Sequence, residues 1–369
     1  MATPALPSLF RRRLLTAGLT APLWPLTVPA ATTTTKSLGP RDLTFPRDLG
    51  SHPDHSIEWW YITGHLRATA GAREFGFQLT FFRSKVLATQ DMTSAFAAKQ
   101  LVFAHAAVTD VAGKKLLHDQ RIAREGFGLA QASPSDTDVK LRGWSLVREA
   151  AQYRAVAKGH AFGFELALRE TQPLLLQGDR GVSRKGPEEK QASFYYSLPQ
   201  LQVKGKLTLG DQTMQVEGSA WLDHEWSQEL MHPQAVGWDW IGMNLLDGSA
   251  LTAYQLRDKS GNALWDGGSY RHPSMGAQPH VFSHGEVLFR PVRYWTSATT
   301  KARYPVEWVV RTPADFYTVK AVIDNQELDS RASTGAIYWE GLCELFDSNS
   351  KLVGHGYLEM TGYASPLRL

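Results

Sequence analysis

The sequence predicts an all-β protein that contains two related antiparallel β-barrels in series. Aromatic residues make up 11% of its 369 residues, a composition that favours strands. From residue 57 onward the periodic segments are strand-like and are separated by turn-forming residues, whereas long amphipathic helices are not evident. Two similar hairpins that open with aromatic strands lie about 180 residues apart. These three observations indicate an all-β fold with an internal duplication.

The expected strands alternate with short turns along the whole chain. Turn-forming groups such as Ala112-Gly113-Lys114 and Asp247-Gly248 separate the apolar runs. In the first half we expect strands over 57–66, 74–82, 101–109, 162–168, 201–209 and 214–222. In the second half we expect strands over 238–245, 251–257, 270–271, 285–294, 306–311, 317–323, 336–346 and 353–360. Spacing of this kind suits barrels or sandwiches.

The duplicated hairpin places a domain boundary near the middle of the chain. Trp59-Trp60-Tyr61-Ile62 opens the first copy and Trp238-Asp239-Trp240-Ile241 opens the second. We therefore predict an N-terminal barrel domain over 43–230 and a C-terminal barrel domain over 231–369. A polar threonine run lies in the preceding segment 31–42, which we predict to be a linker.

The first 30 residues have the features of an export signal. Arg11-Arg12-Arg13-Leu14-Leu15 follows the order of a twin-arginine motif, and Val28-Pro29-Ala30 offers small residues for a signal peptidase. The apolar stretch between them is short and broken by glycine and proline, so it does not suit a membrane span. We therefore predict that 1–30 is a twin-arginine signal peptide and that the mature chain is periplasmic or secreted, without a transmembrane segment. A basic cytosolic tail is the alternative.

The charge distribution argues against nucleic acid as a partner. The chain has 39 basic and 36 acidic residues, and 1–30 contains three arginines and no acidic residue. The remainder is therefore balanced, at 36 basic and 36 acidic residues. A surface without net charge, and without a basic run interleaved with aromatic residues, is not typical of nucleic-acid binding.

The densest polar and aromatic cluster is Trp221-Leu222-Asp223-His224-Glu225-Trp226, at the end of an apolar strand. Alternation along a strand places Asp223 and Glu225 on one face, and His224 with Trp226 on the other. Burial beside an aromatic wall raises the pKa of a carboxyl, so that it can protonate an apolar substrate, and indole faces stabilise a developing cation. We therefore predict Asp223, His224 and Glu225 as catalytic residues. A structural hydrogen-bond network at the barrel rim is the alternative.

Further aromatic and acidic residues are candidates for ligand binding. Glu58 and Trp60 share one face of the first strand, where an acidic residue needs a partner such as Arg83 or His224. Trp238 and Trp240 share one face of the second hairpin, where they either line a cavity or plug a barrel. The predicted ligand-binding residues are Glu58, Trp60, Tyr196, Trp226, Trp238 and Trp240.

Metal and cofactor sites are not expected. A metal alternative would combine His52, His55 and Glu58 with Asp223 or His224, but this spacing matches no standard metal site. The chain lacks a Gly-x-Ser-x-Gly elbow, a phosphate loop and a dinucleotide fingerprint, which disfavours serine hydrolases, kinases and nicotinamide enzymes. Its one cysteine, Cys343, can form neither an internal disulfide nor a cysteine cluster.

Several of these motifs, in this order, resemble the AttH-like, carotenoid 1,2-hydratase superfamily, whose bacterial members are often labelled predicted secreted hydrolases. The resemblance covers roughly 43–363 and implies a pair of lipocalin-like barrels. The motifs are Ile57-Glu58-Trp59-Trp60-Tyr61, Tyr195-Tyr196-Ser197, Trp221-Leu222-Asp223-His224-Glu225-Trp226-Ser227, Gly237-Trp238-Asp239-Trp240 and Gly356-Tyr357-Leu358-Glu359-Met360-Thr361-Gly362-Tyr363.

The resemblance implies two kinds of function, catalysis and a role in transport. Carotenoid hydratases of the superfamily add water to a terminal isoprenoid double bond by acid catalysis, with an aspartate among His, Trp and Tyr residues. His224 and Trp226 match the family's His-x-Trp pair, whereas Asp239 lies between Trp238 and Trp240 and does not follow a tyrosine at the family's spacing. Fungal relatives act as pericyclic cyclases, and AttH-type proteins are associated with ABC-transport systems of the cell envelope.

Two functional hypotheses follow. The first is an exported enzyme, a hydro-lyase or secreted hydrolase, that binds an isoprenoid- or lipid-like molecule and catalyses acid-assisted water addition or hydrolysis. The second is a non-catalytic periplasmic carrier of a lipid or other hydrophobic ligand, working with a cell-envelope ABC transporter. A purely structural role is a third possibility.

Overall fold

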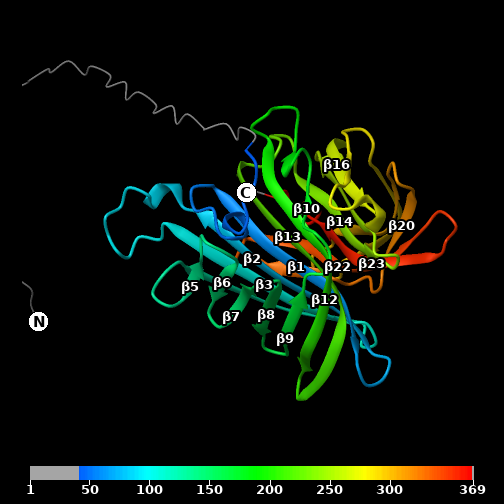
Figure 1. Ribbon diagram of the computed structural model, residues 1–369, viewed down its shortest axis with the longest axis horizontal. Coiled ribbons are helices and arrows are strands. Elements are labelled where there is room, and N and C mark those ends of the chain that lie inside the picture. Colours follow the sequence, from blue (N-terminus) through cyan, green and yellow to red (C-terminus); the bar gives the residue numbers. More distant parts are fainter. Residues whose placement is uncertain (1–40, 368–369) are drawn as a thin grey trace, which may run out of the picture. The chain divides into compact units, whose positions relative to one another are not determined.

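The computed structural model describes residues 41–367 and confirms the expected all-β class (Figure 1). The predicted signal peptide lies outside the described residues. Within the described range the helical elements are single 3-10 turns, η1 (Arg47–Leu49), η2 (Leu87–Thr89) and η3 (Pro273–Met275). No helix among residues 41–367 is both long and apolar enough to cross a membrane.

Sheet A is an antiparallel sheet with the order β4-β3-β2-β1-β13-β12-β9-β8-β7-β6-β5, and β10 and β11 pair with β12. It curls until β6 contacts β3 and β4, so it forms a nearly closed barrel. Its strands are β1 (Ile57–Ala68), β2 (Glu74–Lys85), β3 (Gln100–Asp110), β4 (Lys115–Arg124), β5 (Ala130–Ala132), β6 (Asp138–Leu141), β7 (Trp144–Glu149), β8 (Gln152–Lys158), β9 (Phe162–Arg169), β10 (Leu175–Leu176), β11 (Val182–Arg184), β12 (Ala192–Leu209) and β13 (Gln212–Glu229).

Sheet B follows in the chain and has the order β17-β16-β15-β14-β23-β22-β20-β19-β18, with β21 paired to β22. The predicted boundary at 230/231 falls in the connection between β13 and β14, and both sheets belong to one compact unit, Ser37–Leu369. Its strands are β14 (Gly237–Leu245), β15 (Ala250–Arg257), β16 (Ala263–Arg271), β17 (His280–Phe282), β18 (Leu288–Thr296), β19 (Arg303–Arg311), β20 (Phe316–Ala321), β21 (Glu327–Ser330), β22 (Ala336–Phe346) and β23 (Leu352–Met360).

The two sheets repeat one arrangement, which agrees with the duplicated hairpin seen in the sequence. In sheet A, β1 pairs with β2 on one side and with the last strand, β13, on the other. In sheet B, β14 pairs in the same way with β15 and with the last strand, β23. The fold is therefore that of tandem lipocalin-like barrels.

The structure contains strands that the sequence did not predict. These are β4, β5, β6, β7, β8, β10, β11, β17 and β21. Most of them are short. The longer ones, such as β4 and β8, carry charged residues that are not fully buried, so their apolar periodicity is weak. In addition, the strand expected over 285–294 begins only at Leu288.

β12 also differs from the expectation, because the Tyr195-Tyr196-Ser197 segment belongs to the strand instead of preceding it. A register shift between Leu198 and Leu201 interrupts the pairing with β13, and Gln200 there has a φ of 56°. Pro199 lacks an N–H and would normally end a central strand, but a bulge lets the strand continue past it. The bulge thus makes β12 eighteen residues long.

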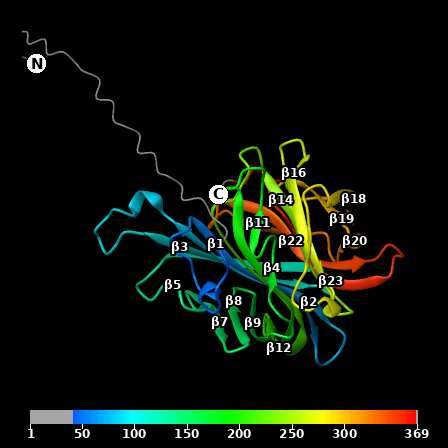
Figure 2. The ribbon, with the colours of Figure 1, turned by 45° about the horizontal axis from the view of Figure 1, so that its top comes forward.

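Figure 2 shows the strands of sheet A, in blue to green, beside those of sheet B, in yellow-green to red. Apolar side chains form a core inside each sheet and a third cluster between the sheets. On β1, Trp60 and Ile62 belong to the core of sheet A, whereas Tyr61 belongs to the cluster between the sheets. On β13, Leu222 and Trp226 point inward in the same way, and Trp221 points toward sheet B. Alternate residues of β1 and β13 therefore pack either in the core of sheet A or in the cluster between the sheets.

Candidate active site between the two sheets

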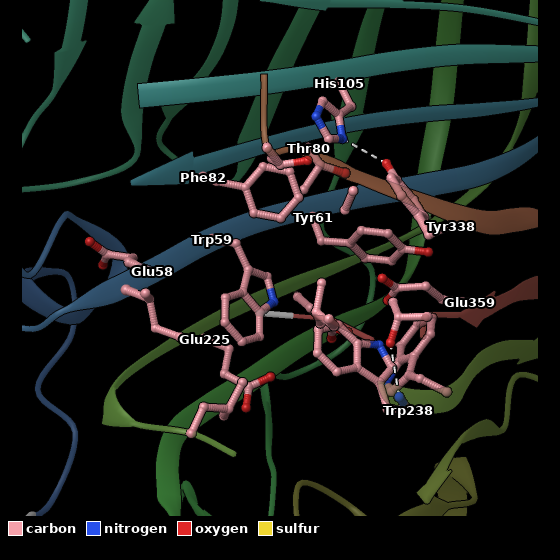
Figure 3. A pocket seen from close by; sticks show the side chains of 18 of the residues that line it. Glu58, Trp59, Tyr61, Thr80, Phe82, His105, Glu225, Trp238, Tyr338 and Glu359 are labelled. Carbon is pink, nitrogen blue, oxygen red and sulfur yellow. Dashed lines mark hydrogen bonds between the residues drawn. The ribbon is translucent and has the colours of Figure 1, made fainter. Parts of the chain in front are cut away.

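A cavity of about 300 Å³ lies between sheet A and sheet B. Its walls are mainly aromatic, and Trp59 and Tyr61 of β1 face Trp238 and Trp240 of β14. Figure 3 shows Tyr61, Tyr338 and Glu359 gathered on one side of this space, with Glu225 on the other side of Trp59. The cavity therefore combines apolar walls with carboxyl groups from both sheets.

The two acidic residues of the β13 cluster line this cavity. Asp223 and Glu225 both face it, whereas His224 lies on the opposite face of the strand, inside sheet A. This is the alternation expected from the sequence. It also separates His224 from the two carboxyls with which it was predicted to form a catalytic group, because its ring nitrogens contact Tyr196 and Glu58 instead.

Asp223 is a buried carboxyl with three hydrogen-bond donors. Its Oδ1 accepts from Ser197 Oγ at 2.5 Å and Trp221 Nε1 at 2.7 Å, and its Oδ2 accepts from the Tyr195 hydroxyl at 2.7 Å. Burial raises the pKa of Asp223 to about 7, although the three donors oppose this shift. Asp223 can therefore change its protonation state near neutral pH.

Glu225 has a different environment on the same face. Its carboxylate lies 3.1 Å from Lys185 Nζ, and it also accepts a hydrogen bond from Ser193. Lys185 is itself buried, and its ammonium lies over the rings of Tyr254 and Tyr195. Glu225 is therefore engaged in a buried ion pair with Lys185.

A second pair of carboxyls enters the cavity from sheet B. Glu340 of β22 and Glu359 of β23 are direct cross-strand partners. Burial, reinforced by the charge of Glu359, raises the pKa of Glu340 well above its usual range. Desolvation likewise raises the pKa of Glu359 to about 7. Glu340 is therefore the more readily protonated member of the pair, and Glu359 can change its protonation state near neutral pH.

Polar atoms beside this pair are not fully partnered. Gln78 Nε2 donates to Glu340 Oε2 at 2.6 Å. Glu340 Oε1 and the Tyr61 hydroxyl, both buried, make no hydrogen bond of ordinary geometry among the residues that the structure describes, although the Tyr61 hydroxyl lies close enough to Glu340 to act on its pKa. An unsatisfied buried polar group is costly and is often found where a ligand binds.

The interior of sheet A contains a separate charged network. Glu58 Oε1 accepts from His224 Nε2 at 2.9 Å and His52 Nδ1 at 2.7 Å, and its Oε2 accepts from Arg83 Nε at 2.7 Å. These partners lower the pKa of Glu58 despite its burial. Burial lowers the pKa of His224 to about 4, so the neutral ring donates from Nε2 and accepts at Nδ1 from Tyr196.

The aromatic residues around this network pack tightly. The ring of Trp60 stacks on His224 with centroids 4.7 Å apart, and Trp226 stacks on His52 at 3.7 Å. Trp60, Tyr196 and Trp226 are fully buried in the core of sheet A, so these three predicted ligand-binding residues do not line the cavity. Trp238, Trp240 and Glu58 do line it.

His52, Glu58 and His224 also form the one group of potential metal ligands found among the described residues, with ligand atoms within 4.8 Å of one another. The nitrogens that would bind a metal already donate to Glu58, and the Arg83 cation contacts the same carboxylate. A divalent cation beside Arg83 would be repelled. Of the alternative set considered from the sequence, the structure brings together His52, Glu58 and His224, whereas Asp223 lies on the other face of β13.

The two carboxyls of sheet B that line the cavity, Glu340 and Glu359, had no role assigned from the sequence. Glu340 follows Tyr338-Trp339 in an expected strand, and nothing in that strand marked it as unusual. Glu359 lies within a family motif but had no assigned role. The available signal was an acidic residue inside a largely apolar strand, the same signal that drew attention to Glu58.

Comparisons with known proteins agree with this architecture. The family model described as AttH-like matches residues 36–363. The chain belongs to the AttH-like family. A candidate AttH protein from Nitrosomonas europaea has a similar solved structure, with 45% identity, a TM-score of 0.81 and coverage of 88% of this chain and 98% of that chain. No curated protein matches the sequence significantly.

Other solved structures share the fold at much lower identity. Kievitone hydratase from Nectria haematococca is 14% identical, with a TM-score of 0.68 and coverage of 88% of this chain and 94% of that chain. CghA, solved with Sch210972, is 11% identical, with a TM-score of 0.50 and coverage of 83% and 88%. At these identities the likeness concerns the fold alone.

Proposed function

We propose that the cavity between the sheets binds a hydrophobic, isoprenoid- or lipid-like molecule and catalyses acid-assisted addition of water to it, as a hydro-lyase would. The observation that carries the proposal is a fully buried carboxyl group beside an aromatic cavity, Glu340, whose Oε1 makes no hydrogen bond of ordinary geometry among the described residues and whose pKa burial raises well above its usual range. Acid catalysis of this kind needs a proton that is held at neutral pH next to an apolar substrate.

Glu340 is the best proton donor among the cavity carboxyls. Glu225 is paired with the Lys185 ammonium, and both oxygens of Asp223 accept hydrogen bonds that stabilise its charged form. Glu340 Oε1 makes no hydrogen bond of ordinary geometry among the described residues, and only the nearby Tyr61 hydroxyl opposes the rise of its pKa. We therefore assign the role of proton donor to Glu340 of β22 and not to Asp223 or Glu225 of β13, the candidates predicted from the sequence.

The remaining groups suit the later steps of a hydration. Protonation of a double bond by Glu340 leaves a carbocation, which the indole and phenol faces of Trp59, Tyr61 and Trp238 stabilise. A water molecule then adds to the cation and loses a proton to a cavity carboxylate. Glu359, whose pKa is about 7, is suited to accept it beside Glu340.

A structural neighbour supports the proposed reaction, and a sequence motif supports the proposed location. A solved structure with this fold is a kievitone hydratase. The twin-arginine motif supports action in the periplasm or outside the cell, after export. The alternative function is carriage of the same class of ligand, with a cell-envelope ABC transporter as partner, and it would use the same apolar walls without the proton transfer.

The test measures binding and turnover separately. An acyclic carotenoid with terminal isoprenoid double bonds is incubated with the protein in ¹⁸O-labelled water, and the product is analysed for an added labelled hydroxyl. We expect Glu340→Gln to retain binding but to lower turnover by about a hundredfold or more. The control is Glu344→Gln, a partly exposed residue of the same strand that does not line the cavity.

The outcomes separate the hypotheses. Equal turnover in Glu340→Gln and the parent protein would remove Glu340 as the donor. Binding of the carotenoid without turnover in the parent protein would favour the carrier. Absence of both would show that the ligand class is wrong.

A further inference from the structure

The β2–β3 and β4–β5 connections expose a cluster of large apolar side chains. We call this cluster the apolar tip. Its exposed fractions are 68% for Leu87, 51% for Met92, 74% for Phe96, 58% for Phe127 and 41% for Leu129. Exposed apolar side chains that gather in this way commonly mark an interaction surface. Figure 1 shows the loop after β2, in cyan, reaching away from the end of sheet A.

The β2–β3 loop is held in place by its own hydrogen bonds. Thr89 Oγ1 donates to the Ala98 carbonyl at 2.8 Å, and Gln90 Nε2 donates to the carbonyls of Val86 and Lys99 at 2.9 and 2.8 Å. These polar side chains satisfy the loop backbone from within. The apolar side chains of the loop are thereby left facing solvent.

The second connection is also built to present an aromatic ring. Phe127 has a φ of 55°, a left-handed conformation that is unfavourable for a bulky residue. Its ring stacks on Phe96 with centroids 5.6 Å apart, and the Arg124 guanidinium lies 3.8 Å from the Phe127 ring centroid. Arg124 Nη1 also donates to the Ala95 carbonyl, which joins the two loops.

Basic residues border the tip. Lys85 and Lys99 flank the first loop, and Arg121 and Arg124 precede the second, against the acidic residues Asp91 and Glu125. The surroundings therefore carry a net positive charge. Exposed phenylalanine and leucine beside arginine and lysine are the composition that binds the interface of an anionic bilayer.

The tip is continuous with the cavity walls. Ser84 of β2 and Phe103 of β3 line the cavity, and the β2–β3 loop connects these two strand ends. We propose that the apolar tip docks onto the surface of an anionic lipid bilayer, with Phe96 and Phe127 inserted at the level of the head groups. A protein docked in this way has its cavity close to a source of hydrophobic ligands.

The experiment measures flotation with lipid vesicles and needs no substrate. The chain from residue 31 onward is used, because the arginine-rich segment 1–30 would bind anionic vesicles by itself and the compact unit begins at Ser37. Vesicles of phosphatidylglycerol and phosphatidylcholine are compared with vesicles of phosphatidylcholine alone. We expect the protein to float with the anionic vesicles.

Variants test whether the tip is responsible. Phe96→Ser combined with Phe127→Ser should lower partitioning by about tenfold or more, because the inserted apolar area is lost. Arg124→Gln should lower the preference for anionic vesicles by about fivefold, the effect of roughly one basic residue near a charged surface. The matched control is Phe316→Ser, a phenylalanine of sheet B with 55% exposure.

Equal thermal unfolding of the parent and variants establishes that each is folded. Loss of flotation in the tip variant with normal flotation of Phe316→Ser supports the proposal. It is overturned if the parent protein floats with neither kind of vesicle, if the tip variant floats normally, or if Phe316→Ser loses as much binding. Capture of a membrane protein without vesicle binding would likewise overturn it.

Discussion

The ionisable groups on the two faces of β13 differ in how their burial is compensated by hydrogen bonds and counter-charges. On the inner face, His224 joins a network in which the Glu58 carboxylate accepts from two histidines and Arg83. On the outer face, the strand lines a cavity in which burial raises the pKa values of Glu340 and Glu359 of sheet B, and Glu340 Oε1 makes no hydrogen bond of ordinary geometry among the described residues. Carboxylates that are paired with cations and hydrogen-bond donors indicate a structural role, whereas buried carboxyls without a counter-charge beside apolar space indicate a site for chemistry.

The largest expected difference between the two faces is in packing. Trp226→Ala should lower the free energy of unfolding by about 3 to 5 kcal/mol, because the indole is fully buried between His52 and Phe194. Trp238→Ala should cost less than about 2 kcal/mol, because this side chain is partly exposed and borders empty space. Urea unfolding at pH 7 measures both.

The order of the two variants should be reversed when binding of a hydrophobic ligand is measured instead of stability. Trp238→Ala should weaken binding of a hydrophobic ligand, whereas folded Trp226→Ala should retain it. Equal stability losses in the two variants would contradict the assignment of one face to structure and the other to binding.

The next largest effect concerns the buried charge network. Glu58→Gln should lower the free energy of unfolding by about 3 kcal/mol, because it leaves the buried Arg83 guanidinium without its carboxylate. Glu165→Gln is the control, since its pair with Arg154 is mostly exposed and should contribute less than about 1 kcal/mol. A loss below about 1 kcal/mol for Glu58→Gln would show that the network is dispensable for folding.

The last prediction concerns the pH dependence of stability, and its sign should differ between the faces. The pKa values of Asp223 and Glu359 rise to about 7 on folding, so the stability that they provide is complete below about pH 4 and is lost as pH increases to about 7. The pKa of Glu58 falls on folding, so its contribution is present above about pH 4.5 and is lost as pH decreases.

Urea unfolding between pH 3 and pH 9 checks this prediction. Glu340→Gln should flatten the decline on the alkaline side, because the pKa of Glu340 is also raised by burial. Glu58→Gln should flatten the decline on the acid side. A stability that rises steadily from pH 5 to pH 8 would contradict the assignment of neutral acids to the cavity.

Much of the site's local geometry could be predicted from the sequence. Alternation along β1 and β13 correctly separated Asp223 and Glu225 from His224, and Glu58 has both of the expected partners, Arg83 and His224. These predictions succeeded because the period of two is a property of the strand itself and because a buried carboxylate requires a counter-charge.

The sequence by itself determined the all-β class, the duplicated hairpin and the face on which each side chain of β13 lies, since these depend on local periodicity. Only the tertiary structure decided which face meets empty space. Glu340 and Glu359 reach the cavity through the pairing of β22 with β23 and the packing of sheet B against sheet A. Contacts between residues more than a hundred positions apart leave no pattern in the local sequence. The position of the sheet B carboxyls at the cavity therefore became clear only from the packing of the two sheets.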